Sequence, residues 1–146
     1  MKIARVSSGQ SVDVNAWTYW NGSQRVAGES NAAVVQTVNQ LTGVTQDLDG
    51  EGFIAVSIPN DYFHDATVDL SYASSPVGPW TAPQPVYVIP QIRQYGGEMA
   101  YIPTFHPELA SGDQLLVSYN INTLDGYSVL LRDVHSYQPQ FIMISG

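Results

Sequence analysis

A histidine and a glutamate separated by a single proline are the residues most able to do chemistry in this sequence. His106 and Glu108 flank Pro107 in AYIPTFHPELASGDQLLVSYNIN, residues 100–122, a stretch that otherwise has the composition of buried strand. Positions i and i+2 of a strand share a face, so an extended TFHPEL would point the imidazole and the carboxylate to one side. The carboxylate could then fix the tautomer of the ring. Pro107 favours an edge strand, because proline is tolerated there and not within a sheet.

Glycoside hydrolysis would require a second carboxyl group near Glu108. The two groups lie about 5–5.5 Å apart in retaining enzymes and about 6.5–9.5 Å apart in inverting ones. Asp47, in GVTQDL at residues 43–48, is the best partner that the sequence offers. Its neighbours Asp49, Gly50 and Glu51 also fit a solvated turn, and this alternative is the favoured one.

Further polar and aromatic residues are candidates for ligand binding. Tyr119, Asn120 and Asn122 come at the end of the strand pattern LLVSYNI, although asparagine at a strand end is more often a turn former. Aromatic residues that could stack on sugar rings are Trp17, Tyr19, Trp20 and Trp80, although Trp80 fits better as a clasp under its own loop. The acidic cluster at 60–69 lacks a recognised metal spacing, so a solvated loop is expected there.

The elements that must position these side chains are strands. Runs of apolar or alternating residues, punctuated by glycine, proline, asparagine and aspartate, predict strands at 2–8, 16–20, 52–59, 66–74, 84–90, 115–121, 127–134 and 141–145. The run at 52–59 is apolar nearly throughout, which fits a strand covered on both faces. Only 31–41 could be helical, and its β-branched residues weaken that interpretation. The sequence predicts an all-β chain of sandwich, barrel or propeller architecture.

Composition excludes several classes of function. The 146 residues carry a net charge of −8, which argues against nucleic acid or an anionic membrane as a partner. The chain has no cysteine, so disulfide and thiolate chemistry are excluded. No apolar run approaches the roughly 20 residues that cross a bilayer. The opening MKIARVSS has no apolar core, so it is not expected to be a signal peptide.

Two segments of the chain share one plan, which suggests repeated sheets. Residues 43–60 and 103–122 each contain a short strand, a turn rich in glycine and aspartate, and an apolar strand ending in asparagine. They lie about 60 residues apart, a period that suits propeller blades with an insertion.

Three motifs carry a family resemblance: SSPVGPW (74–80), FHPELASGDQLLVSYNIN (105–122) and SYQPQFIMI (136–144). With them the sequence resembles the C-terminal part of a bacterial family of five-bladed β-propellers, formerly a domain of unknown function, related in fold to arabinanases and other furanosidases. The resemblance implies a partial propeller of about two and a half four-stranded blades in a single domain, 1–146. Residues 1–42 would end one blade and form a connection, 43–90 a full blade, and 98–146 the final blade.

The function that the resemblance implies is processing or binding of a furanose-rich oligosaccharide or polysaccharide. Glu108 and Asp47 would then be the catalytic carboxyl groups. The expected substrate-binding residues are His106, Tyr101, Tyr119, Asn120 and Asn122. No resident cofactor is expected, although the axis of a propeller has room for a divalent ion such as calcium.

Two departures from the family pattern keep a non-catalytic alternative open. Gln138 and Gln140 stand where the family usually has arginines, and glutamine cannot form the same bidentate ion pairs. The chain is also less than half the family's length, without the region expected to carry an N-terminal catalytic acid. The alternative is an assembly module that completes a propeller by self-association or with a separate N-terminal half. Family members are commonly exported, which leaves the compartment undetermined.

Overall fold

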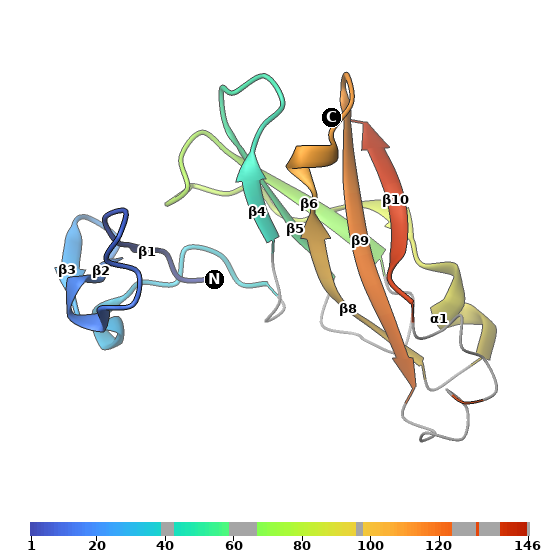
Figure 1. Ribbon diagram of the computed structural model, residues 1–146, viewed down its shortest axis with the longest axis horizontal. Coiled ribbons are helices and arrows are strands. Elements are labelled where there is room, and N and C mark those ends of the chain that lie inside the picture. Colours follow the sequence, from blue (N-terminus) through green and yellow to red (C-terminus); the bar gives the residue numbers. More distant parts are fainter. Residues whose placement is uncertain (39–42, 59–66, 96–97, 124–130, 132–137, 146) are drawn as a thin grey trace.

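The computed structural model describes residues 1–38, 43–58, 67–95, 98–123, 131 and 138–145, and within them the fold is all-β (Figure 1). A small sheet contains β1 (Ala4–Arg5), β2 (Thr18–Trp20) and β3 (Arg25–Ala27). The four-stranded sheet contains β4 (Gly43–Gln46), β5 (Phe53–Ser57), β6 (Thr67–Ala73) and β7 (Gln84–Val88) in sequential order. The third sheet contains β8 (Glu98–Phe105), β9 (Gln114–Thr123) and β10 (Gln140–Ser145), in the order β10-β9-β8.

Short helical segments connect these antiparallel strands. The α-helix α1 spans Pro90–Tyr95 between β7 and β8. Three 3-10 turns are η1 (Val14–Ala16), η2 (Glu29–Asn31) and η3 (Pro107–Leu109). The segment 31–41 contains no α-helix where it is described: Asn31 ends η2, residues 32–38 are irregular, and residues 39–41 lie outside the described residues.

The hydrophobic core lies between the four-stranded sheet and the β8–β9–β10 sheet. Its largest fully buried members include Ile54, Val56 and Leu70 from one sheet and Leu115 and Val117 from the other. The two sheets approach most closely where β4 begins. A Cβ added to Gly43 would lie 3.3 Å from the Pro103 carbonyl oxygen, so this contact between β4 and β8 favours glycine.

The strand β5 is covered on both faces, as its continuous apolar sequence predicts. Ile54, Ala55, Val56 and Ser57 are all at most 4% exposed. On the side away from the core, Gln36 lies against the sheet, where its Nε2 donates to Ser71 Oγ at 2.7 Å and to the Thr81 carbonyl at 3.1 Å. The segment that follows the small sheet therefore forms a further layer.

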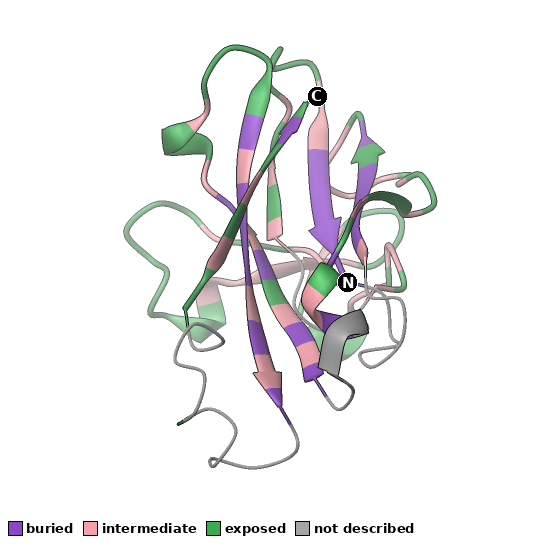
Figure 2. Ribbon diagram, turned by 90° about the vertical axis from the view of Figure 1, so that its right-hand side faces the viewer, coloured by how far each residue is buried: buried purple, intermediate pink, exposed green. Residues whose placement is uncertain are grey.

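The β8–β9–β10 sheet has one buried and one open face. Along β9, Leu115, Val117, Tyr119 and Ile121 are buried, whereas Leu116, Asn120 and Asn122 are only half-buried. Figure 2 shows this alternation along β9, in contrast to the nearly continuous burial of β5. We call the second side the open face; its side chains come from Met99, Tyr101, Thr104, His106, Leu116, Ser118, Asn120, Asn122, Phe141 and Met143.

One feature of this sheet differs from the sequence prediction. TFHPEL is not a continuous strand, because β8 ends at Phe105 and Pro107 begins η3. Proline suits the first position of a helical turn, where no backbone N–H is needed. The predicted strand at 127–134 lies outside the described residues apart from Leu131, and β10 pairs directly with β9.

Candidate functional site on the open face

A β-bulge in β8 decides which side chains reach the open face. Tyr101 pairs with Asn120 and Thr104 pairs with Ser118, so three steps along β8 match two along β9. At the bulge Ile102 has a φ of 52°, in the left-handed region that β-branched residues rarely adopt. Tyr101 and His106 are five residues apart and would face opposite sides of a regular strand. The one extra residue places both on the open face.

His106 is held between a serine and a glutamate. Its Nε2 lies 2.8 Å from Ser118 Oγ, and its Nδ1 lies 3.4 Å from Glu108 Oε1. The backbone N–H of His106 donates to the Leu116 carbonyl at 2.9 Å, which continues the ladder one residue beyond β8. The pairing of His106 with Glu108 that the sequence suggests is therefore present. Its cause is the η3 turn and not strand alternation.

The His106 ring also contacts an aromatic residue of β10. The centroids of the His106 and Phe141 rings are 5.9 Å apart with an interplanar angle of 48°. Phe141 pairs with Ser118 of β9, so its side chain lies on the same face of the sheet as Ser118 and His106. It is 57% exposed, and Met143 is 47% exposed. The sequence analysis missed both residues, although the alternation of Phe141 and Met143 with Ile142 and Ile144 is the signal that predicts their outward side.

The two predicted asparagines lie within β9 and not in a turn after it. Asn120 and Asn122 are both half-buried on the open face. Asn122 Oδ1 accepts from the Thr123 N–H at 2.8 Å, so part of its amide serves its own backbone. The Asn120 side chain has no hydrogen-bond partner within the described segments, which leaves its donor and acceptor for a ligand.

Tyr119 lies in the core, away from the other predicted binding residues. Its side chain is 1% exposed, its hydroxyl donates to Gln91 Oε1 at 3.2 Å, and its ring lies 6.1 Å from that of Tyr87. Burial, followed by the interaction with Tyr87, raises the pKa of Tyr119 far above its ordinary value. Tyr119 packs in the core, on the opposite side of the sheet, and does not contribute to the open face.

Asp47 lies in the turn between β4 and β5, the alternative that the sequence favours. Its Oδ1 accepts from the Leu48 N–H at 2.8 Å, and its own N–H donates to the Gly52 carbonyl at 2.8 Å. It lines a hollow of about 400 Å³ with Tyr72, and Glu108 is not among the residues that line it. Burial raises the pKa of Tyr72, and the negative charge of Asp47 adds to the rise.

Metal ligands and membrane-spanning helices are not evident in the described segments. No group of three or more histidine, cysteine, aspartate or glutamate residues is gathered there in a way that could hold a metal ion. In the same segments, no helix has the length and apolar character to span a bilayer. Room for a divalent ion such as calcium on a propeller axis remains an expectation from the family resemblance.

Fold and site together define an all-β protein with a polar and aromatic sheet face. The family model that matches the chain is the Domain of unknown function (DUF5005), over residues 1–146, and the chain belongs to this family. No curated protein matches the chain.

Proposed function

We propose that the chain is a partial β-propeller of the glycoside-hydrolase type and that it binds carbohydrate through the open face. Support for the architecture comes from the four-stranded sheet, whose strands follow one another in sequence as in a blade. Further support comes from β4 and β8, the first strands of their sheets. They contact one another at Gly43 and point in the same direction in Figure 1, as the innermost strands of neighbouring blades do.

The observation that carries the function is the grouping of Tyr101, Asn120 and His106 on one face. A sugar ring presents apolar C–H faces and a rim of hydroxyl groups. The aromatic rings of Tyr101 and Phe141 suit the C–H faces. The amide of Asn120, which has no partner among the described residues, suits the hydroxyl groups. A face that only packs against another blade would need no such polar groups, because each buried polar atom without a partner is costly.

Binding is a better-supported role than hydrolysis. The Glu108 side chain is 66% exposed and lies against His106, whereas Asp47 belongs to a separate hollow. Hydrolysis requires two carboxyl groups about 5–9.5 Å apart on either side of one bond. The catalytic roles of Glu108 and Asp47 therefore remain predictions, tested by release of reducing ends from arabinan and its loss in Glu108→Gln.

Calorimetric titration with arabinan, galactan and xylan tests the binding proposal. We expect at least one of these glycans to bind. Asn120→Ala and Tyr101→Ala should each weaken that binding about tenfold, the equivalent of about 1.4 kcal/mol. Asn15→Ala, an exposed asparagine remote from the face, is the matched control and should bind normally. Absence of binding to every glycan would refute the proposal.

The exposed apolar residues favour one second candidate, assembly. Ile102, Phe141 and Met143 are 41%, 57% and 47% exposed around the open face. A partner blade, from a second copy or from a separate N-terminal half, would cover them. Light scattering of the wild type should then show a dimer that Phe141→Ser converts to a monomer. A monomer at millimolar concentration argues against self-association.

A further inference from the structure

Two hollows border the loop that contains the SSPVGPW motif, and one proline lines both. Each has a volume of about 400 Å³. The first lies between Trp20 and Val77, and the second lies between Asp47 and Tyr72. Pro79 lines the first and the second alike. We propose that the two hollows form one groove for an elongated neutral oligosaccharide, with Pro79 at its centre. This inference rests on the proposed carbohydrate-binding function and assigns it a second site.

The loop is built to hold Pro79 in place. Gly78 has a φ of 87°, and a Cβ added there would lie 3.0 Å from the Trp80 nitrogen, so the position favours glycine. Trp80 Nε1 donates to the Pro76 carbonyl at 3.3 Å, which makes this side chain the clasp that the sequence predicts. At the end of the loop, the Thr81 N–H donates to the Tyr72 carbonyl at 2.9 Å. These contacts fix the wall between the hollows before any ligand arrives.

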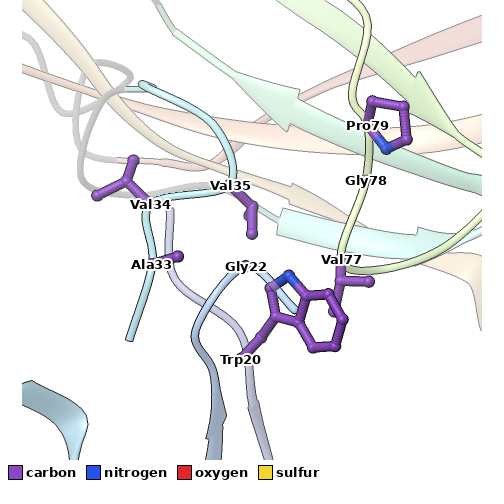
Figure 3. Close-up of a pocket in the computed structure, with 8 residues that line it drawn as sticks. All are labelled: Trp20, Gly22, Ala33, Val34, Val35, Val77, Gly78 and Pro79. Carbon is purple, nitrogen blue, oxygen red and sulfur yellow. The ribbon is translucent and has the colours of Figure 1, made fainter. Parts of the chain in front are cut away.

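The first hollow has an apolar lining that suits the C–H face of a sugar ring. Figure 3 shows the indole of Trp20 beside Val77, with Val35 pointing toward it and Pro79 farther along the loop. The Trp20 Nε1–H has no acceptor within the described segments, so it can donate to a ligand hydroxyl. An aromatic ring with an adjacent free donor provides both kinds of contact that a sugar offers.

The second hollow has two carboxylates on an otherwise mostly apolar lining. Asp47 and Glu51 supply carboxylate oxygens, which are hydrogen-bond acceptors, beside the rings of Phe53 and Tyr72. The hydroxyl of Tyr72 is a hydrogen-bond donor as well as an acceptor. Among the residues that the structure describes, no lysine or arginine lines either hollow, and the chain carries a net charge of −8. Acidic glycans are therefore disfavoured, and neutral sugars rich in hydroxyl groups are preferred.

The size of the groove predicts the length of its ligand. Sites for small molecules have volumes of about 300–1,000 Å³. Either hollow alone suits one sugar unit, and a ligand that crosses Pro79 must have several. Affinity should therefore rise with chain length and depend on residues of both hollows.

Titration with neutral arabino-oligosaccharides of one to six units tests the groove. We expect the hexamer to bind at least tenfold more tightly than the monomer. Trp20→Ala and Asp47→Asn should each remove most of that gain. Asp47→Asn is nearly isosteric, so it tests the groove even if Trp20→Ala disturbs the small sheet. Trp17→Ala is the control, because Trp17 donates to the Ser11 carbonyl and does not line the hollow.

The outcomes separate this inference from the proposal on which it rests. If the glycans bind and only Asn120→Ala weakens them, the groove is refuted and the open face stands. If none of the oligosaccharides binds, the groove is refuted, and the open face is judged by its own titration with arabinan, galactan and xylan. Polygalacturonate that binds as tightly as the neutral hexamer would contradict the assignment to neutral sugars.

Discussion

At the scale of single residues, the surroundings of His106 determine which ring nitrogen carries the proton. An ionised Glu108 can only accept, so the nitrogen facing it, Nδ1, must carry the hydrogen. In the neutral ring Nε2 is then an acceptor, and the hydroxyl of Ser118 donates to it over 2.8 Å. Glu108 therefore positions the imidazole. Ser118 occupies Nε2, the ring nitrogen that a ligand would otherwise contact.

We predict that neutral His106 is the Nδ1–H tautomer. The ¹⁵N chemical shifts of the two ring nitrogens in long-range correlation spectra measure this directly. Glu108→Ala removes the acceptor and should shift the population toward the Nε2–H form, with Ser118 as the acceptor. A wild-type ring that is already Nε2–H would contradict this assignment.

Tyr119 predicts how stability depends on alkaline pH. Its pKa in the folded state is raised above the ordinary value of 10.0, chiefly by burial. Below pH 10 both states keep the proton, and the stabilising effect is complete. Above pH 10 the unfolded chain loses the proton while the folded chain keeps it, so the free energy of unfolding falls by up to about 1.4 kcal/mol per pH unit.

Urea denaturation between pH 8 and pH 11 should show this fall, and Tyr119→Phe should lessen it. Tyr19→Phe, in the small sheet, is the control and should leave the pH dependence unchanged. An equal slope in Tyr119→Phe and in the wild type would show that another group is responsible.

At the scale of elements, the bulge in β8 combines strain with function. Ile102 is in the left-handed region, which both its β-branched side chain and the following Pro103 disfavour. Such a conformation costs of order 1–3 kcal/mol and persists where the surrounding structure imposes it. Here the consequence is that Tyr101, Thr104 and His106 share one face.

We predict that Ile102→Gly stabilises the protein by about 0.5–1 kcal/mol, because relief of strain exceeds the entropic cost of glycine. Val44→Gly is the matched control: Val44 is 40% exposed against 41% for Ile102, and it pairs regularly with Ala55 in β4. The control should lose about 1 kcal/mol. Thermal or urea unfolding measures both, and destabilisation of equal size in the two variants would show that Ile102 is not strained.

The elements also show what could be read from the sequence. Hydrophobic patterning located most of the strands, because β5 is buried on both faces and β9 on one. The family resemblance, and not patterning, suggested four of the residues on the open face: Tyr101, His106, Asn120 and Asn122. Hydrophobic patterning could not predict the bulge. The extra residue is defined by how β8 pairs with β9, and apart from Pro103 the local sequence shows little sign of it. For the same reason patterning extended β8 through His106, where η3 begins instead.

At the scale of the whole molecule, Gln36 links the small sheet to the rest. The Val35 N–H donates to the Met1 carbonyl and the Ala33 N–H to the Trp20 carbonyl, so the segment 33–36 is tied to the small sheet. Gln36 then donates to Ser71 Oγ and to the Thr81 carbonyl of the four-stranded sheet. Ser71 is 1% exposed, so without Gln36 its hydroxyl would lose this partner inside the protein.

We therefore predict that Gln36→Ala loosens the small sheet and leaves the core intact. Two hydrogen bonds are lost at once, at a cost of about 1–3 kcal/mol. Hydrogen exchange should become faster at the Ala33 amide, which bonds to Trp20, and stay unchanged at the buried Val117 of β9. Gln24→Ala, an exposed glutamine beside β3, should change neither. Equal acceleration at Ala33 and Val117 would instead mean that the three sheets unfold as one unit, and the Trp20 hollow would then be as rigid as the core.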